Sequence, residues 1–116
     1  MSVSLVYNDE HILKLSNSLF GLLHETIMEI IERENIWYSY RLHRMLIELD
    51  QNIYGAGGVF ADVSEFLKTK KELLLFAYLI KETAKEKKEI FAKFGDCIKH
   101  LEEFHDKLVN YAQTLP

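Results

Sequence analysis

The chain has 116 residues, of which 48% are hydrophobic and 28% charged, the balance of one globular domain rather than of a disordered tail or a fibre. Fourteen basic residues stand against eighteen acidic ones, and the formal net charge is −4. Binding to nucleic acid is therefore not expected, because holding phosphates requires an excess of lysine and arginine. We expect one domain over residues 1–116.

The start of the chain and its longest apolar run give an expectation for its compartment. Asp9 and Glu10 precede the first basic residue, Lys14, which does not match a signal peptide. The longest apolar run, Leu73 to Ile80, is far shorter than the roughly 20 residues of a membrane-spanning helix. Cys97 is the only cysteine and cannot form an internal disulfide, as is typical of a reducing compartment. We expect a cytoplasmic protein without a membrane segment.

Proline and glycine are sparse, which favours helices. The only proline is the terminal Pro116, so no interior position lacks a backbone donor. Leucine, isoleucine and phenylalanine dominate the apolar residues. The one glycine cluster, Gly55, Gly57 and Gly58, divides the chain near its middle. Two helical pairs joined by a longer connection are expected.

The first helix is expected to begin after Asn8 or Asp9 and to run to about Glu34. Either residue can cap a helix N-terminus, and the apolar positions from Ile12 to Ile31 follow a spacing of three and four. Asn35 enters the left-handed conformation more readily than most residues and is the expected break, the alternative being one bent helix that continues through Ile36.

The second helix is expected to follow Asn35 and to end near Tyr54, before Gly55. Its apolar residues recur at helical steps and predict a buried stripe. The stripe consists of Tyr38, Leu42, Met45, Leu46, Leu49 and Ile53.

Two capping boxes mark the second half of the chain. Asp62 with Glu65 predicts a short helical turn through Leu67, and Thr69 with Glu72 predicts a third helix from Lys70 to Phe94 that stops at Gly95. The apolar run inside this third helix suggests that neighbours cover it on all sides.

A fourth helix is expected after Asp96, which can cap it. Its apolar residues recur at steps of four and three, as in the seam of a helical bundle. They are Cys97, Leu101, Phe104, Leu108, Tyr111 and Leu115. The predicted fold is therefore all-α: an antiparallel four-helix bundle with a short extra helix in the central glycine-containing connection.

The negative charge is concentrated in the first half of the chain. Residues 1–58 hold eight acidic and four basic residues, whereas ten of each sign balance in residues 59–116. Glu25, Glu29 and Glu32 are spaced four and three apart and therefore share one side of the first helix. Like charges at this spacing repel unless a basic partner offsets them, although a simply solvated helix face would look the same.

An aromatic stripe lies on the second helix, away from its expected core side. Trp37, Tyr40, Arg44, Ile47, Gln51 and Tyr54 recur at helical steps. Tryptophan, tyrosine and arginine are the residue types that most often anchor protein interfaces. The stripe can be an interface or a second core face, and the exposure of Trp37 separates the two.

A metal site is the alternative chemistry. Glu102 and His105 form a Glu-x-x-His pair of the kind that binds iron in di-iron bundles, but the second such pair is missing. No motif specifies a reaction, so neither catalysis nor a cofactor is expected.

In size, acidity and helical character the chain resembles the helical immunity proteins that bacteria make against colicin-type or contact-dependent toxins. The resemblance implies a non-enzymatic inhibitor that covers a basic, nuclease-like toxin domain. Alternatives are the metal-binding bundle, or a helical chaperone or adaptor that holds a segment of a partner; monomer and homodimer both remain open. The expected contact residues are Glu25, Glu29, Glu32, Trp37, Tyr40, Arg44 and Tyr54.

Overall fold

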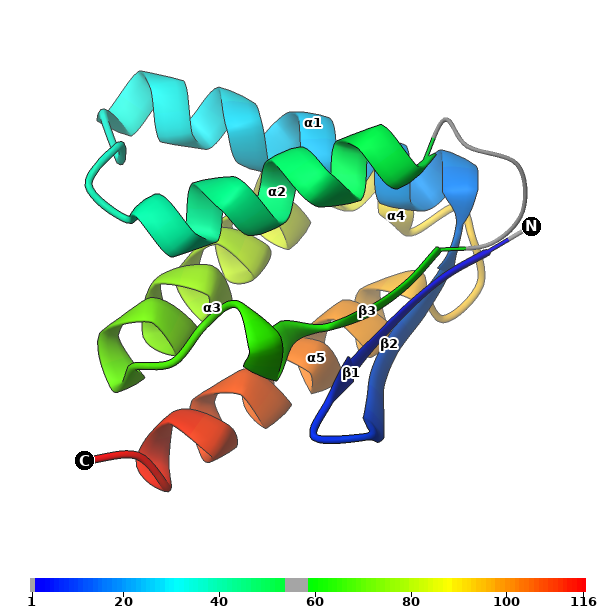
Figure 1. Ribbon diagram of the computed structural model, residues 1–116. Helices are drawn as coiled ribbons and strands as arrows, with labels where there is room; N and C mark the ends of the chain where they lie inside the picture. The colour runs from blue at the N-terminus through cyan, green and yellow to red at the C-terminus, as the bar shows by residue number, and fades with distance from the viewer. Residues whose placement is uncertain (1, 54–58) are drawn as a thin grey trace.

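A computed structural model describes residues 2–53 and 59–116, and Figure 1 shows the arrangement of the chain. In chain order the elements are β1 (Ser2–Tyr7), β2 (Glu10–Ser16), α1 (Asn17–Glu34), α2 (Tyr40–Ile53), β3 (Val59–Asp62), the 3-10 turn η1 (Val63–Glu65), α3 (Lys70–Glu86), α4 (Lys88–Phe91) and α5 (Cys97–Gln113).

The chain begins with a β-hairpin, so the expectation of a first helix starting after Asn8 or Asp9 is wrong. Both residues have positive φ, 47° and 69°, and form the two-residue turn between β1 and β2. Turns with two positive φ angles match the twist of paired strands, and asparagine and aspartate tolerate them. Antiparallel pairing places Val3 opposite Leu15 and Leu5 opposite Leu13. Their shared face is buried, which sets the register.

A third strand makes the fold α/β rather than all-α, which corrects the predicted four-helix bundle. β3 pairs in parallel with β1, and the strand order is β2-β1-β3. The parallel connection passes through α1 and α2, as parallel strands require a long crossover. Four main helices, α1, α2, α3 and α5, accompany this mixed sheet in the described residues.

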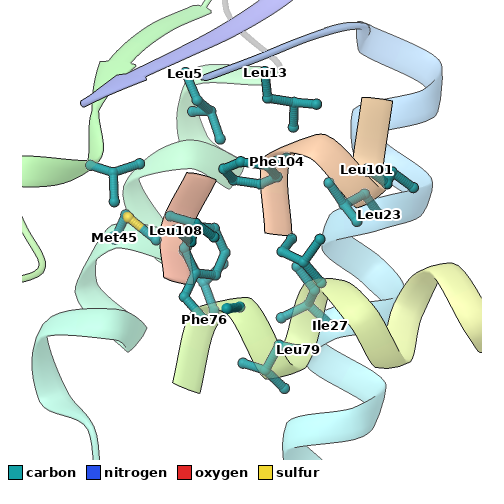
Figure 2. Packing of buried hydrophobic residues seen from close by; sticks show 14 of the residues in the cluster. Leu5, Leu13, Leu23, Ile27, Met45, Phe76, Leu79, Leu101, Phe104 and Leu108 are labelled. Atoms are coloured by element: carbon teal, nitrogen blue, oxygen red, sulfur yellow. The ribbon is translucent and has the colours of Figure 1, made fainter. Parts of the chain in front are cut away.

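The core lies between the sheet and the helices. Figure 2 shows Leu5 and Leu13 pointing from the sheet toward Phe104 of α5. The Phe104 ring meets Phe76 of α3 edge-on, with centroids 5.5 Å apart and planes at 84°. Edge-to-face rings are a favoured aromatic arrangement, and both side chains are buried. α5 therefore contacts the sheet on one side and α3 on the other.

Several predicted helix ends are confirmed. Asn35 caps α1 in the left-handed conformation, with φ 56° and ψ 46°. Thr69 and Glu72 form the complete capping box of α3. The Asp62 carboxylate accepts a hydrogen bond from Ser64 N at the start of η1. These ends depend on neighbouring residues alone, which is why local patterns predict them.

The third helix is shorter than expected. α3 ends at Glu86, because Lys87 leaves the helical conformation with φ −109° and ψ 24°. The separate α4 follows and brings Phe91 into the core. Gly95, at φ 59°, precedes α5 as the expected stop. Not all of the apolar run is covered, since Leu74 and Tyr78 on α3 are exposed.

The stripes of α2 and α5 are largely confirmed. Buried residues on them are Leu42, Met45, Leu46, Leu49, Cys97, Leu101, Phe104 and Leu108. Tyr38 is wrong as a core residue: it lies before α2 and is 76% exposed. Asp96 precedes α5 but makes no side-chain cap hydrogen bond. The expected helix end at Tyr54 and Gly55, and the cluster Gly55, Gly57 and Gly58, fall outside the described residues.

The sheet predicts one stability effect. Changing Leu5, which is 1% exposed, to alanine should lower the free energy of unfolding by about 2–5 kcal/mol, because it leaves a cavity between β1 and α5. Leu74→Ala, on the exposed side of α3, is the matched control and should cost under about 0.5 kcal/mol. Urea unfolding followed by circular dichroism measures both. Equal effects would show that β1 does not belong to the core.

Candidate protein-binding surface

α1 separates apolar from acidic side chains along its length. Its buried side carries Phe20, Leu23, Thr26, Ile27, Ile30 and Ile31. Glu25, Glu29 and Glu32 are exposed on the other side, as the spacing predicts. With Asp50 of α2 they border an open groove of about 770 Å³ that also has Leu22 and Met28 in its lining. We call Glu25, Glu29, Glu32 and Asp50 the acidic row.

Hydrogen bonds between α1, α2 and the loop joining them hold the groove in place. His24 Nε2 donates to the carbonyl oxygen of Leu46 at 2.7 Å, so α1 and α2 are tied together near their middles. His43 Nε2 donates to the carbonyl oxygen of Ile36 at 3.1 Å and fixes the loop before α2. Figure 1 shows α1 and α2 side by side at the top of the view. Both histidines therefore have structural roles here.

The three arginines of the chain are all engaged away from the acidic row. Arg33 pairs with Glu86 and, at 3.5 Å, with Glu34. Arg41 pairs with Glu72 at 2.7 Å.

Arg44, the third arginine, pairs with Glu48 at 3.4 Å one turn along α2. Within the described part of the chain, no ion pair or hydrogen bond offsets the acidic row. Its charge is left to solvent or to a partner.

The Glu72 carboxylate links α2 to the start of α3. Burial alone would raise the pKa of Glu72, but hydrogen bonds from the backbone N–H groups of Lys68 and Thr69 and from Arg41 outweigh it and lower that pKa. Glu72 therefore stays ionised and keeps Arg41 engaged, so this arginine does not neutralise the groove.

A hydrogen bond from Tyr78 joins the C-terminal end of α1 to α3. Its hydroxyl donates to Glu34 Oε1 at 2.6 Å, next to the Arg33 pair with Glu86. The hydrogen bond to Glu34 raises the pKa of Tyr78 to about 12, and burial and the negative charges of Glu34 and Glu82 add to the shift. These contacts hold the end of α1 that carries Glu32.

Three aromatic residues are exposed where the chain enters α2: Trp37 and Tyr38 in the loop after α1, and Tyr40, the first residue of α2. We call them the aromatic cluster. Trp37 is 52% exposed and its ring stacks on His43, with centroids 4.8 Å apart and planes at 15°. Tyr40 is 76% exposed and opens α2. The stripe containing Trp37 is therefore not a second core face. Trp37 itself lies in the loop, which corrects its expected place on the second helix.

The remaining residues of the predicted stripe follow the outer side of α2. Arg44 and Ile47 are exposed there, one and two turns after Tyr40. The side chain of Gln51 and all of Tyr54 lie outside the described part of the structure. Trp37, Tyr40 and Arg44 are thus all exposed, on the loop before α2 and on α2 itself. Tyr40 and Arg44 line a second groove, between α2 and the start of α3, which is separate from the groove of the acidic row.

Sequence reasoning missed two groove residues. Asp50 lies seven residues after His43, on the side of α2 that faces α1, and extends the acidic row onto the second helix. Gly21 lies one turn before Glu25 and also lines the groove. Packing the two helices as an antiparallel pair in advance could have placed Asp50 there.

The structure does not support the metal alternative. Glu102 and His105 line a groove between α3 and α5 together with Lys81, Lys85 and Lys88. Lysine ammonium groups beside the pair disfavour a bound cation. In the described residues, no three His, Cys, Asp or Glu side chains are placed to hold a metal ion.

None of the helices in residues 2–53 and 59–116 is long and apolar enough to cross a bilayer. Comparison with family models, with curated proteins and with solved structures finds no match to this chain.

The Tyr78 hydrogen bond predicts a loss of stability at high pH. Folding raises the pKa of Tyr78 from about 10 to about 12. The contribution of its hydrogen bond to the free energy of unfolding is therefore complete below pH 10 and is lost as the pH rises from 10 to 12. Tyr78→Phe should remove this part of the pH dependence. Urea unfolding between pH 9 and 12 measures it, and the difference in absorbance at 295 nm between the two proteins locates the Tyr78 titration. Identical pH profiles would contradict the prediction.

Proposed function

We propose that the protein binds a basic surface of a partner protein through the acidic row and the aromatic cluster. The observation that supports this most directly is the distribution of charge. The arginines are paired elsewhere, while the four carboxylates around the groove have no partner in the described residues. Uncompensated carboxylates, on a molecule that also exposes several aromatic rings, fit a protein interface better than a catalytic site.

The two parts of the surface act at different ranges. Carboxylates with no internal partner attract a basic surface over about 10 Å at ordinary salt, and this raises the association rate. Trp37 and Tyr40 provide apolar area with polar tips, which tolerate water before binding and become buried afterwards. Burial of these rings slows dissociation.

The specific function that we propose is inhibition by covering, as in immunity proteins that neutralise a nuclease-like toxin. An acidic surface imitates the negative charge of a nucleic acid and can occupy the basic groove of an enzyme that binds one. The net charge of −4 and the concentration of acidic residues in the first half of the chain agree with this role.

The decisive experiment expresses the protein encoded by the adjacent reading frame, alone and together with this chain. We expect toxicity when the adjacent product is expressed alone, rescue by co-expression, and a complex that copurifies. An adjacent product that is harmless, or one whose toxicity this chain does not relieve, would count against inhibition by covering.

The acidic row predicts a defect in association. Changing Glu25, Glu29 and Glu32 together to glutamine should lower the association rate with the partner about tenfold or more and weaken its salt dependence, because long-range attraction is lost. The triple change of Glu89, Glu102 and Glu103 to glutamine, on exposed positions of α4 and α5, removes equal charge as a control. Stopped-flow binding at several salt concentrations measures both, and equal defects would point to net charge rather than to the row.

The aromatic cluster predicts a defect in dissociation. Trp37→Ala should raise the dissociation rate about 30-fold, the effect of removing an anchor worth about 2 kcal/mol, and should leave the association rate nearly unchanged. Phe94→Ala, equally exposed but in the segment between α4 and α5, is the control. Surface plasmon resonance separates the two rates. An unchanged dissociation rate would show that Trp37 does not belong to the interface.

A further inference from the structure

Gly21 is a helical glycine that no packing among the described residues requires. It lies in the second turn of α1, where glycine costs roughly 0.5–1 kcal/mol relative to alanine. A Cβ built on it would meet no atom of the described residues within 4 Å. Neither a left-handed conformation nor packing against the described part of the chain therefore requires glycine here.

The bare backbone at Gly21 belongs to the floor of the acidic groove. Gly21, Glu25, Met28 and Glu32 follow one another at steps of four and three, so they share one side of α1. Ser18, also small, lies on the same side one turn earlier. Along α1 the groove is therefore lined first by the small residues Ser18 and Gly21 and then by the carboxylates of the acidic row.

We propose that the partner binds through a basic helix that crosses α1 closest at Gly21 and runs along the acidic row. This inference rests on the proposed function and names the element of the partner that binds. A glycine at a contact lets two backbones approach closely. A helix face that is only solvated, or that only attracts charge, has no need of a glycine. Lysine or arginine residues spaced four and three apart on that helix would face Glu25, Glu29 and Glu32.

A helix fits this groove better than an extended segment. Both walls are helices, whose interior backbone groups are already paired within each helix. An extended chain lying there would bury its own N–H and C=O groups without partners, at a cost that a helix avoids by pairing them internally. The stretch from Ser18 to Glu32 measures about 21 Å, which corresponds to about four helical turns.

The test uses a designed probe: an alanine-rich helical peptide of about 18 residues with three lysines on one face, spaced four and three apart, and alanine one turn before the first lysine. A control peptide has the same composition with the lysines spread around the helix. Titration calorimetry at low salt measures the affinity of the full chain and its variants for both peptides.

The variants are Gly21→Ala, Gly21→Leu, the glutamine triple at Glu25, Glu29 and Glu32, and Asn110→Leu as a control on the exposed side of α5. We expect the patterned peptide to bind, with affinity reduced about tenfold by Gly21→Leu and by the triple, and unchanged by Asn110→Leu. Gly21→Ala should raise the thermal midpoint by a few degrees yet weaken binding, which a purely structural glycine would not do.

Three results would overturn the proposal. Equal binding of both peptides would show charge attraction without a docked helix. If Gly21→Leu binds the patterned peptide with full affinity while the glutamine triple does not bind it, the partner helix does not approach closely at Gly21. The role of the acidic row would remain supported. Absence of binding to either peptide would exclude the helix and leave the proposed function to the test with the adjacent gene product.

Discussion

The structure depends first on the two-sided character of α1. Its apolar side must be buried between the sheet and α3, and residues such as Ile27 and Ile30 are at most 2% exposed. Burying that side turns the opposite side outward, where the sequence offers carboxylates and Gly21. The position of the groove is therefore a consequence of core packing, and α2 forms its second wall because His24 donates to the Leu46 carbonyl.

The placement of the arginine side chains leaves the groove surface negatively charged. Arg33 and Arg41 join helices that are distant in sequence, through Glu86 and Glu72, so they serve the fold. Ion pairs at the surface contribute little stability each, but they determine which carboxylates are compensated. The acidic row lacks such partners among the described residues, and it keeps an electrostatic field that neither composition nor net charge alone would locate.

The hairpin shows where local patterns mislead. Ile12 and Leu15 continue the three-and-four spacing of α1, but Leu13 and Leu15 also alternate as a strand requires. A short apolar stretch fits both the helical and the strand periodicity. The positive φ angles of Asn8 and Asp9 form a turn, so this stretch pairs as a strand. The pairing that stabilises β1 includes β3, more than fifty residues away, which no local window contains. Sequence reasoning therefore found the four main helices, with α3 and α4 merged into one, and missed the sheet.

The amino-acid sequence by itself determined the helix ends at Asn35 and Thr69, the seam of α5 and the line of Glu25, Glu29 and Glu32, since each depends on residues within a few turns. Only the tertiary structure decided that Trp37 is exposed on a loop, that Asp50 joins the acidic row and that Gly21 faces open space among the described residues. These three properties depend on which elements pack together. Contacts between segments distant in the chain determine that packing, and spacing along one segment cannot encode it.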